Sequence, residues 1–240
     1  MSRLFARLAL LAAVIAAVLV AGAAPAYRYA NIDLGLAFNA LRFGVYAAMG
    51  AGALAVLWLI FAFIGRSSSG LGSVIVALVL AGLAAYFPLS WRATAKELPP
   101  IHDITTDTAN PPVFVALKPA REASDNGLDY KTSPAAQQQA YADIQTLVTD
   151  VPIADMFARA EKVARDMGWE VVAAVPEEGR IEATDTTKWW GFKDDVVIRI
   201  TTDGTATRVD VRSMSRVGKS DMGKNAARIR EFLAKLKEAK

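Results

Sequence analysis

Hydrophobic side chains are concentrated at the start of the chain, in three stretches that carry almost no charge. The stretches cover about residues 4–24, 43–64 and 71–90, and Arg7 is the one charged residue inside them. Each reaches the ~20 residues that a helix needs to cross the ~30 Å hydrocarbon core of a bilayer. An ion or proton path through a membrane uses internal charges. We therefore expect residues 1–96 to form a transmembrane anchor and not a conduit.

The first stretch permits two interpretations. Arg3 and Arg7 precede the apolar run, and Ala24-Pro25-Ala26 resembles the A-x-A cleavage site of a signal peptide. The run is long for a signal peptide, which favours an uncleaved span, so the anchor has two or three spans. Small residues predict helices that approach one another closely; they are Gly50, Gly52, Gly72 and Gly82, together with many alanines.

Basic residues beside the stretches indicate the orientation. Their numbers on the two sides of the membrane nearly balance, so the positive-inside rule is decided by Arg3 and Arg7, next to the first span. These arginines place the N-terminus in the cytoplasm. Three spans then put the C-terminal domain outside, and cleavage of the first stretch gives the same result. We expect a multi-pass protein of the cell (inner) membrane with a periplasmic or equivalent extracytoplasmic domain.

Composition changes this picture in two respects. Residues 1–96 hold seven basic residues and one acidic residue, whereas residues 97–240 hold 20 basic and 23 acidic residues. The positive net charge therefore belongs to the anchor and does not indicate a nucleic-acid-binding protein. The chain has no cysteine, which excludes disulfides, thiolate catalysis and cysteine-based zinc sites.

The rest of the chain predicts a connecting strap at 97–150 and an α+β domain at 151–240. Six prolines interrupt the strap, and Val113–Leu117 is a short apolar run suited to an edge strand. Apolar residues spaced three and four apart predict a helix over 153–167. Alternating residues on both sides of Pro176-Glu177-Glu178-Gly179 predict a first hairpin.

A second hairpin follows, with Asp203-Gly204 as its predicted turn. Pairing outward from this turn puts Ile200 opposite Thr207, Arg199 opposite Arg208, and Asp195 opposite Arg212. Ser220 or Asp221 is the predicted cap of a last helix, and Asn225 lies on its apolar side as a partly buried amide. The expected domain is an antiparallel four-stranded sheet with two helices packed on one face.

The stretches Gly179–Thr184, Trp190–Arg199 and Asp210–Arg230 resemble the uncharacterised family catalogued as domain of unknown function 1499, over about residues 100–238. The resemblance implies a domain carried behind a lipoprotein signal or membrane spans, with no established reaction. Many members have an Asn-Cys-Val-Ser-like motif near the domain start. Here the region from Asp107 to Phe114 has no cysteine, so no role of that motif is carried over.

Basic residues near the end of the chain form the best candidate site. Arg216-Val-Gly-Lys-Ser-Asp leads into a helix start, where free N–H groups and the helix dipole favour an anion. The predicted anion-binding residues are Arg199, Arg212, Ser213, Arg216, Lys219 and Arg228. The competing interpretation, which we favour, is that Asp194, Asp195 and Asp210 form ion pairs that stiffen the sheet.

The leading functional hypothesis is a non-enzymatic, membrane-tethered binding or interaction domain that presents an Arg-rich face to an anionic ligand, lipid or partner. The partners expected are the bilayer itself and an anionic lipid, an envelope metabolite or a membrane protein. The alternatives are an envelope hydrolase acting on an ester or phosphate, and an assembly factor for a membrane complex. We expect no cofactor, since His102, Asp103 and Asp107 are a weak metal pattern and no P-loop, GxSxG or HExxH is present.

Overall fold

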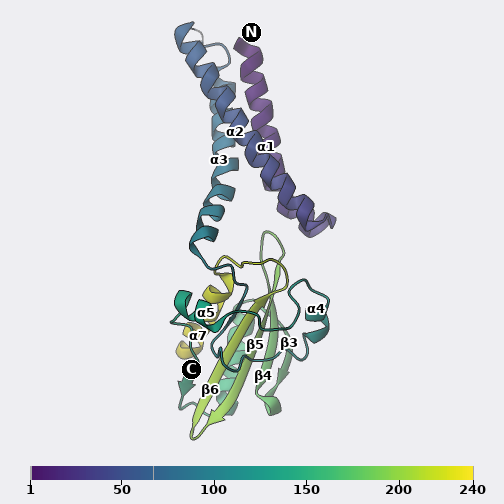
Figure 1. Cartoon of the computed structure of the whole chain (residues 1–240), viewed down its shortest axis with the longest axis vertical. Helices are drawn as coiled ribbons and strands as arrows, with labels where there is room; N and C mark the ends of the chain where they lie inside the picture. Colours follow the sequence, from purple (N-terminus) through teal and green to yellow (C-terminus); the bar gives the residue numbers. More distant parts are fainter. Residues whose placement is uncertain (1, 67, 240) are drawn as a thin grey trace. The chain divides into compact units, whose positions relative to one another are not determined.

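The computed structural model describes residues 2–66 and 68–239 and divides into two compact units, each described in turn (Figure 1). The first unit holds the residues up to Thr94 together with Trp189–Gly191. The second holds Ala95–Lys188 and the residues from Phe192 onward.

Three helices make up the N-terminal unit, as the sequence predicts: α1 (Ser2–Ala30), α2 (Leu34–Ile64) and α3 (Leu71–Glu97). Each is long and apolar enough to cross a membrane by length and composition. Asp33 begins α2 by accepting the Leu36 N–H at 3.0 Å. Pro25 and Pro88 lie within α1 and α3 without ending them, as proline can in membrane helices.

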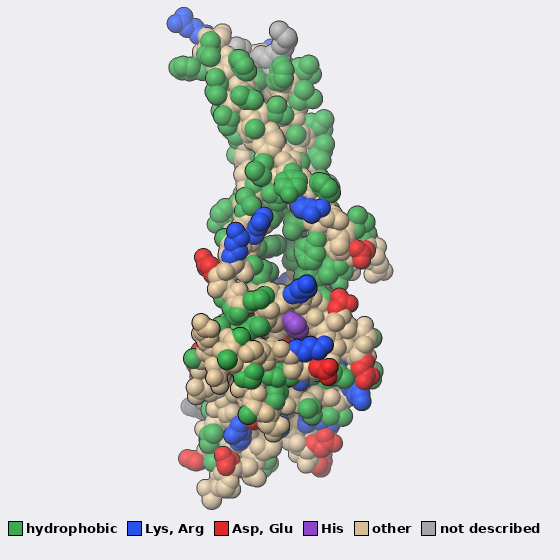
Figure 2. Space-filling model, viewed as in Figure 1, with side chains coloured by type: hydrophobic (Ala, Val, Ile, Leu, Met, Phe, Trp, Pro, Cys, Tyr) green, Lys and Arg blue, Asp and Glu red, His purple; other side chains and the backbone are tan. Residues whose placement is uncertain are grey.

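Alanine, and not glycine, forms most of the contact surface between these helices. The hydrophobic core of the unit contains ten alanines, and Gly44 is a buried glycine of α2. A β-carbon added at Gly44 would meet Val20 at 2.7 Å, whereas one added at position 50, 52, 72 or 82 would meet nothing within 4 Å. The predicted close approach of the helices at small residues holds for the alanines and is wrong for those four glycines, where no other described part of the chain comes within 4 Å of an added β-carbon. Large hydrophobic side chains cover the outside of the three helices (Figure 2).

The C-terminal unit is built on one antiparallel sheet, but it has six strands and not four. The order is β1-β6-β5-β4-β3, and β2 also pairs with β6. The strands are β1 (Asp103–Thr105), β2 (Leu147–Thr149), β3 (Glu170–Val175), β4 (Arg180–Thr186), β5 (Lys193–Asp203) and β6 (Ala206–Ser215). β1 and β2 come from the predicted strap; at three residues each they are too short to show an alternating pattern.

The second hairpin has the predicted faces but a register shifted by two residues. Ile200 lies opposite Val209, Arg199 opposite Asp210, and Asp195 opposite Met214. Asp203 pairs with Ala206, so the turn is Gly204-Thr205, and Gly204 (φ 62°) occupies the first central position, where a type II′ turn places glycine. A shift by an even number keeps every side chain on its face, so the faces are as predicted, whereas the predicted partners and the predicted turn residues Asp203-Gly204 are wrong.

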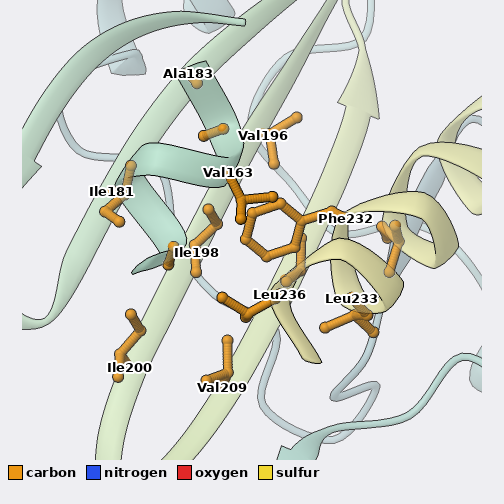
Figure 3. Packing of buried hydrophobic residues seen from close by; sticks show 14 of the residues in the cluster. Val163, Ile181, Ala183, Val196, Ile198, Ile200, Val209, Phe232, Leu233 and Leu236 are labelled. Atoms are coloured by element: carbon orange, nitrogen blue, oxygen red, sulfur yellow. The ribbon is translucent and has the colours of Figure 1, made fainter. Parts of the chain in front are cut away.

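Two longer helices, α6 (Ile153–Asp166) and α7 (Lys224–Glu238), supply the core on one face of the sheet. Figure 3 shows Val163 of α6 and Phe232 and Leu236 of α7 gathered beside Ile198 of β5. The Phe232 ring also stacks on Trp169 at 5.3 Å between centroids.

The opposite face of the sheet packs Val197 and Met214 against Phe114 and Leu117. Phe114 and Leu117 belong to the segment 97–150, which also contains two short helices, α4 (Lys118–Glu122) and α5 (Pro134–Ala140). The polar side chains on this second face lie between the sheet and that segment.

Candidate functional site

Arg212, a predicted anion-binding residue, lies inside the C-terminal unit and is 3% exposed. Its guanidinium donates to both carboxylate oxygens of Asp103, with Nε–Oδ1 at 3.0 Å and Nη2–Oδ2 at 2.8 Å. It also donates to the carbonyls of Pro112 and Leu128. This two-point contact is the strong form of an ion pair. The cross-strand pair predicted between Arg212 and Asp195 is wrong because of the register shift.

Asp195 is instead the centre of a second buried group. It accepts from Arg121 at 3.2 Å and from two nitrogens of Arg216 at 2.9 and 2.8 Å. Arg121 is fully buried and also donates to the Met214 carbonyl at 3.0 Å. Burial lowers the pKa of the Arg121 guanidinium, while Asp195 acts in the opposite direction. The carboxylate holds both cations: Arg216, which directly follows β6, and Arg121 of α4.

The segment before α4 is fastened by a buried carboxylate. Glu182 is 0% exposed and accepts the backbone N–H groups of Val115, Ala116 and Leu117 at 3.0, 2.9 and 2.9 Å. Arg180 contacts the same carboxylate. The predicted edge strand over Val113–Leu117 therefore does not form, because these N–H groups bond to a side chain and not to a neighbouring strand.

Arg199 belongs to a third group, around Asp210. Asp210 accepts from Arg199 and Arg208, both at 2.9 Å, and both arginines also reach Asp107. Burial raises the pKa of Asp210, but hydrogen bonds from Thr146 and the two arginines outweigh burial and hold the pKa below its usual value. We call these three groups, with Glu182 and Arg180, the ion-pair network.

The remaining predicted residues lie on the other face, beside α7. Asn225 is fully buried; its Oδ1 accepts from Ser213 at 2.7 Å and from Arg228 at 2.6 Å, and its Nδ2 donates to the His102 carbonyl at 2.9 Å. Arg228 also bonds to Asp194 at 2.7 Å. The predicted anion-binding residues are thus divided between the two faces of the sheet and do not converge.

Some of the exposed basic residues lie on residues 216–224, which run from the end of β6 to the first residue of α7 and which we call the basic loop. Lys219 and Lys224 are exposed, and Arg216 is partly exposed. Lys193 lies beside the loop, because its carbonyl accepts the Arg216 N–H at 3.0 Å. Lys193 is also exposed. Sequence reasoning missed Lys193 and Lys224; the alternation in β5 puts Lys193 on the face of Asp195, but its closeness to Arg216 depends on the correct register.

Buried polar contacts fix the shape of the basic loop. The Asp221 carboxylate accepts the N–H groups of Gly223 and Asn225, both at 2.8 Å. The N-cap position of α7 is nevertheless Gly223, so the predicted cap at Ser220 or Asp221 is wrong. Burial raises the pKa of Asp221. Asn126 donates to the Gly218 carbonyl at 3.0 Å. These hydrogen bonds fix the backbone of the loop, whose lysines are exposed.

The residues of the weak metal pattern do not come together. Asp103 is bonded to Arg212 and Asp107 to the arginines around Asp210, while His102 Nδ1 lies 3.4 Å from the Lys219 carbonyl. Within residues 2–66 and 68–239 no cluster of three or more His, Asp or Glu side chains is placed to hold a metal ion.

Comparison with known proteins agrees with the fold boundaries. The family model described as "Protein of unknown function (DUF1499)" matches residues 103–236, which run from the first residue of β1 into the last turn of α7. No curated protein matches the chain. The match covers more than half of the sequence and includes both partners of the Arg212–Asp103 pair. The chain belongs to the DUF1499 family and carries its family domain behind three apolar helices that are long enough to span a membrane.

Proposed function

We propose that this chain is a non-enzymatic, membrane-anchored binding protein whose C-terminal domain lies outside the cytoplasm and binds an anionic group at the basic loop. One observation carries the proposal. The arginines of the ion-pair network are bonded to carboxylates, whereas Lys219 and Lys224 are exposed on a loop of fixed shape.

The charge balance of the network supports this choice. Six arginines meet five carboxylates there: Arg121, Arg180, Arg199, Arg208, Arg212 and Arg216 against Asp103, Asp107, Glu182, Asp195 and Asp210. An anion that entered would have to displace a buried carboxylate from its arginine, and breaking such a pair costs about 3–5 kcal/mol. The network is therefore better suited to holding the segment 97–150 on the sheet than to binding a ligand.

The basic loop has the opposite character. Lys219, Lys224 and the neighbouring Lys193 bring three exposed cations to one end of the sheet. Arg216 is already paired there with Asp195, and Asp125 is an exposed acid close by. Asp221 is buried, and its carboxylate is occupied by backbone N–H groups of the loop. The excess of positive charge at this end favours phosphate or carboxylate groups through contacts that salt weakens.

The test uses the full chain in nanodiscs and two anionic probes: tripolyphosphate in solution, and phosphatidylglycerol in the disc. We expect the double variant Lys219→Glu, Lys224→Glu to abolish the binding of both probes. Lys162→Glu with Lys235→Glu is the matched control, because it changes the net charge equally at exposed sites on α6 and α7. The proposal is wrong if neither probe binds the wild-type chain, or if both double variants weaken binding to the same degree.

A further inference from the structure

The basic loop also carries an exposed apolar residue in an unfavourable backbone conformation. Met222 is 40% exposed and has φ 52°, a left-handed value that a residue with a β-carbon rarely adopts. The hydrogen bonds of Asp221 and the acceptance of the Met222 N–H by Ser220 at 3.3 Å hold this conformation. Strain that the surroundings maintain at an exposed position indicates a role for that position.

The basic loop is built against the residues that directly follow α3. The Ile101 carbonyl accepts the Asp221 N–H at 3.1 Å, and the His102 carbonyl accepts the Ser215 N–H at 2.9 Å. Leu98 Cδ1 lies 3.3 Å from where a β-carbon on Gly223 would stand. Leu98 is the first residue after α3. The residues on which the basic loop packs are therefore joined to the last apolar stretch by only a few residues of chain.

We propose that the basic loop docks on the anionic headgroup layer of the bilayer that holds α1–α3, with Lys219 and Lys224 at the headgroups and Met222 entering the interface. This inference rests on the proposed function and names its partner as lipid. A cluster of lysines beside an exposed apolar side chain matches the chemistry of such a surface, and each lysine near it contributes about fivefold to binding. The last apolar stretch ends at Trp91-Arg92, an aromatic and basic pair typical of the membrane edge.

The chain has no cysteine, so a single introduced cysteine can be labelled with a thiol-reactive fluorophore without a second labelling site. The full chain with Met222→Cys carries an environment-sensitive fluorophore in nanodiscs of phosphatidylcholine, or of phosphatidylcholine with about 30% phosphatidylglycerol. Thr205→Cys is the control, since it is exposed in the turn at the other end of β5 and β6. We expect a blue-shifted signal, quenched by lipid-attached quenchers, at position 222 in anionic discs and no change at position 205.

Adding Lys219→Ala and Lys224→Ala should lower the ratio of docked to undocked label about 25-fold, and about 1 M salt should release it. Lys162→Ala with Lys235→Ala should leave the ratio unchanged. Hydrogen exchange in β6 checks that each variant is folded. The docking inference is overturned if position 222 gives the same signal in both discs.

Tripolyphosphate separates the two proposals. If it binds in a manner that depends on Lys219 and Lys224 while the label does not dock, the proposed function stands and the lipid partner is wrong. If tripolyphosphate does not bind and the label does not dock, both proposals fail.

Discussion

We expect Arg212→Met to lower the free energy of unfolding of the C-terminal unit by much more than most single substitutions do. The side chain is 3% exposed, its partner Asp103 is 1% exposed, and two hydrogen bonds join them at 3.0 and 2.8 Å. Arg212→Met leaves the Asp103 carboxylate buried without a cation, a loss of about 3–5 kcal/mol. Adding Asp103→Leu removes that charge, so the double variant should recover about 2–3 kcal/mol of the loss. Recovery stays incomplete, because the carbonyls of Pro112 and Leu128 lose their donor.

The assay is a urea titration of the full chain in detergent micelles, followed by a short proteolysis pulse that reads the unfolded fraction of the C-terminal unit. Arg230→Met is the matched control, since Arg230 makes an equally short contact with Asp143 but both side chains are about half exposed. It should cost at most about 1 kcal/mol. The reasoning is refuted if Arg212→Met costs no more than Arg230→Met, or if adding Asp103→Leu restores nothing.

Two further predictions concern the same unit. Gly179→Ala should destabilise it by more than about 2 kcal/mol, because Gly179 has φ 60° and a β-carbon there would lie 2.0 Å from the Ile200 carbonyl oxygen; Gly204→Ala, at φ 62° with open space, should cost only about 1 kcal/mol in the same titration. Burial, and then the charge of Asp103, raise the pKa of Tyr130 to about 12. The stability that the neutral phenol contributes is therefore present below pH ~10 and is lost between pH ~10 and ~12. Tyr130→Phe should flatten this fall in the free energy of unfolding, and an unchanged slope against pH would contradict the assignment.

Local patterns were sufficient for the elements with long periodic or alternating runs. The spacing of hydrophobic residues and turn residues such as Gly179 predicted the three apolar helices, α6, α7 and the strands β3 to β6. β1 and β2 could not be predicted in this way, because a three-residue strand is defined by its partner. Here the partner is the outer edge of β6, more than fifty residues away in sequence.

The candidate site was harder to predict for the same reason. Arg121 gave no signal in the sequence, since a basic residue in a short polar helix is normally exposed; in the structure it is fully buried against Asp195, 74 residues away. Glu182 reads as an ordinary polar position in a strand, yet it binds three consecutive N–H groups. Such contacts depend on tertiary packing, which no single-sequence periodicity contains.

The hairpin register was nevertheless open to prediction from charge. The predicted register and the observed one differ by two residues and bury the same apolar side chains, so hydrophobicity cannot choose between them. Arg180 lies opposite Arg199 across β4 and β5. The predicted register would have added Arg208 directly opposite Arg199, giving three arginines in a row, and like charges in that position are destabilising. The observed register puts Asp210 there and leaves Arg212 beside Asp103. The ion-pair network thus helps to select one register of the β5–β6 hairpin from two that bury the same apolar side chains. A purely apolar face could not distinguish between these registers.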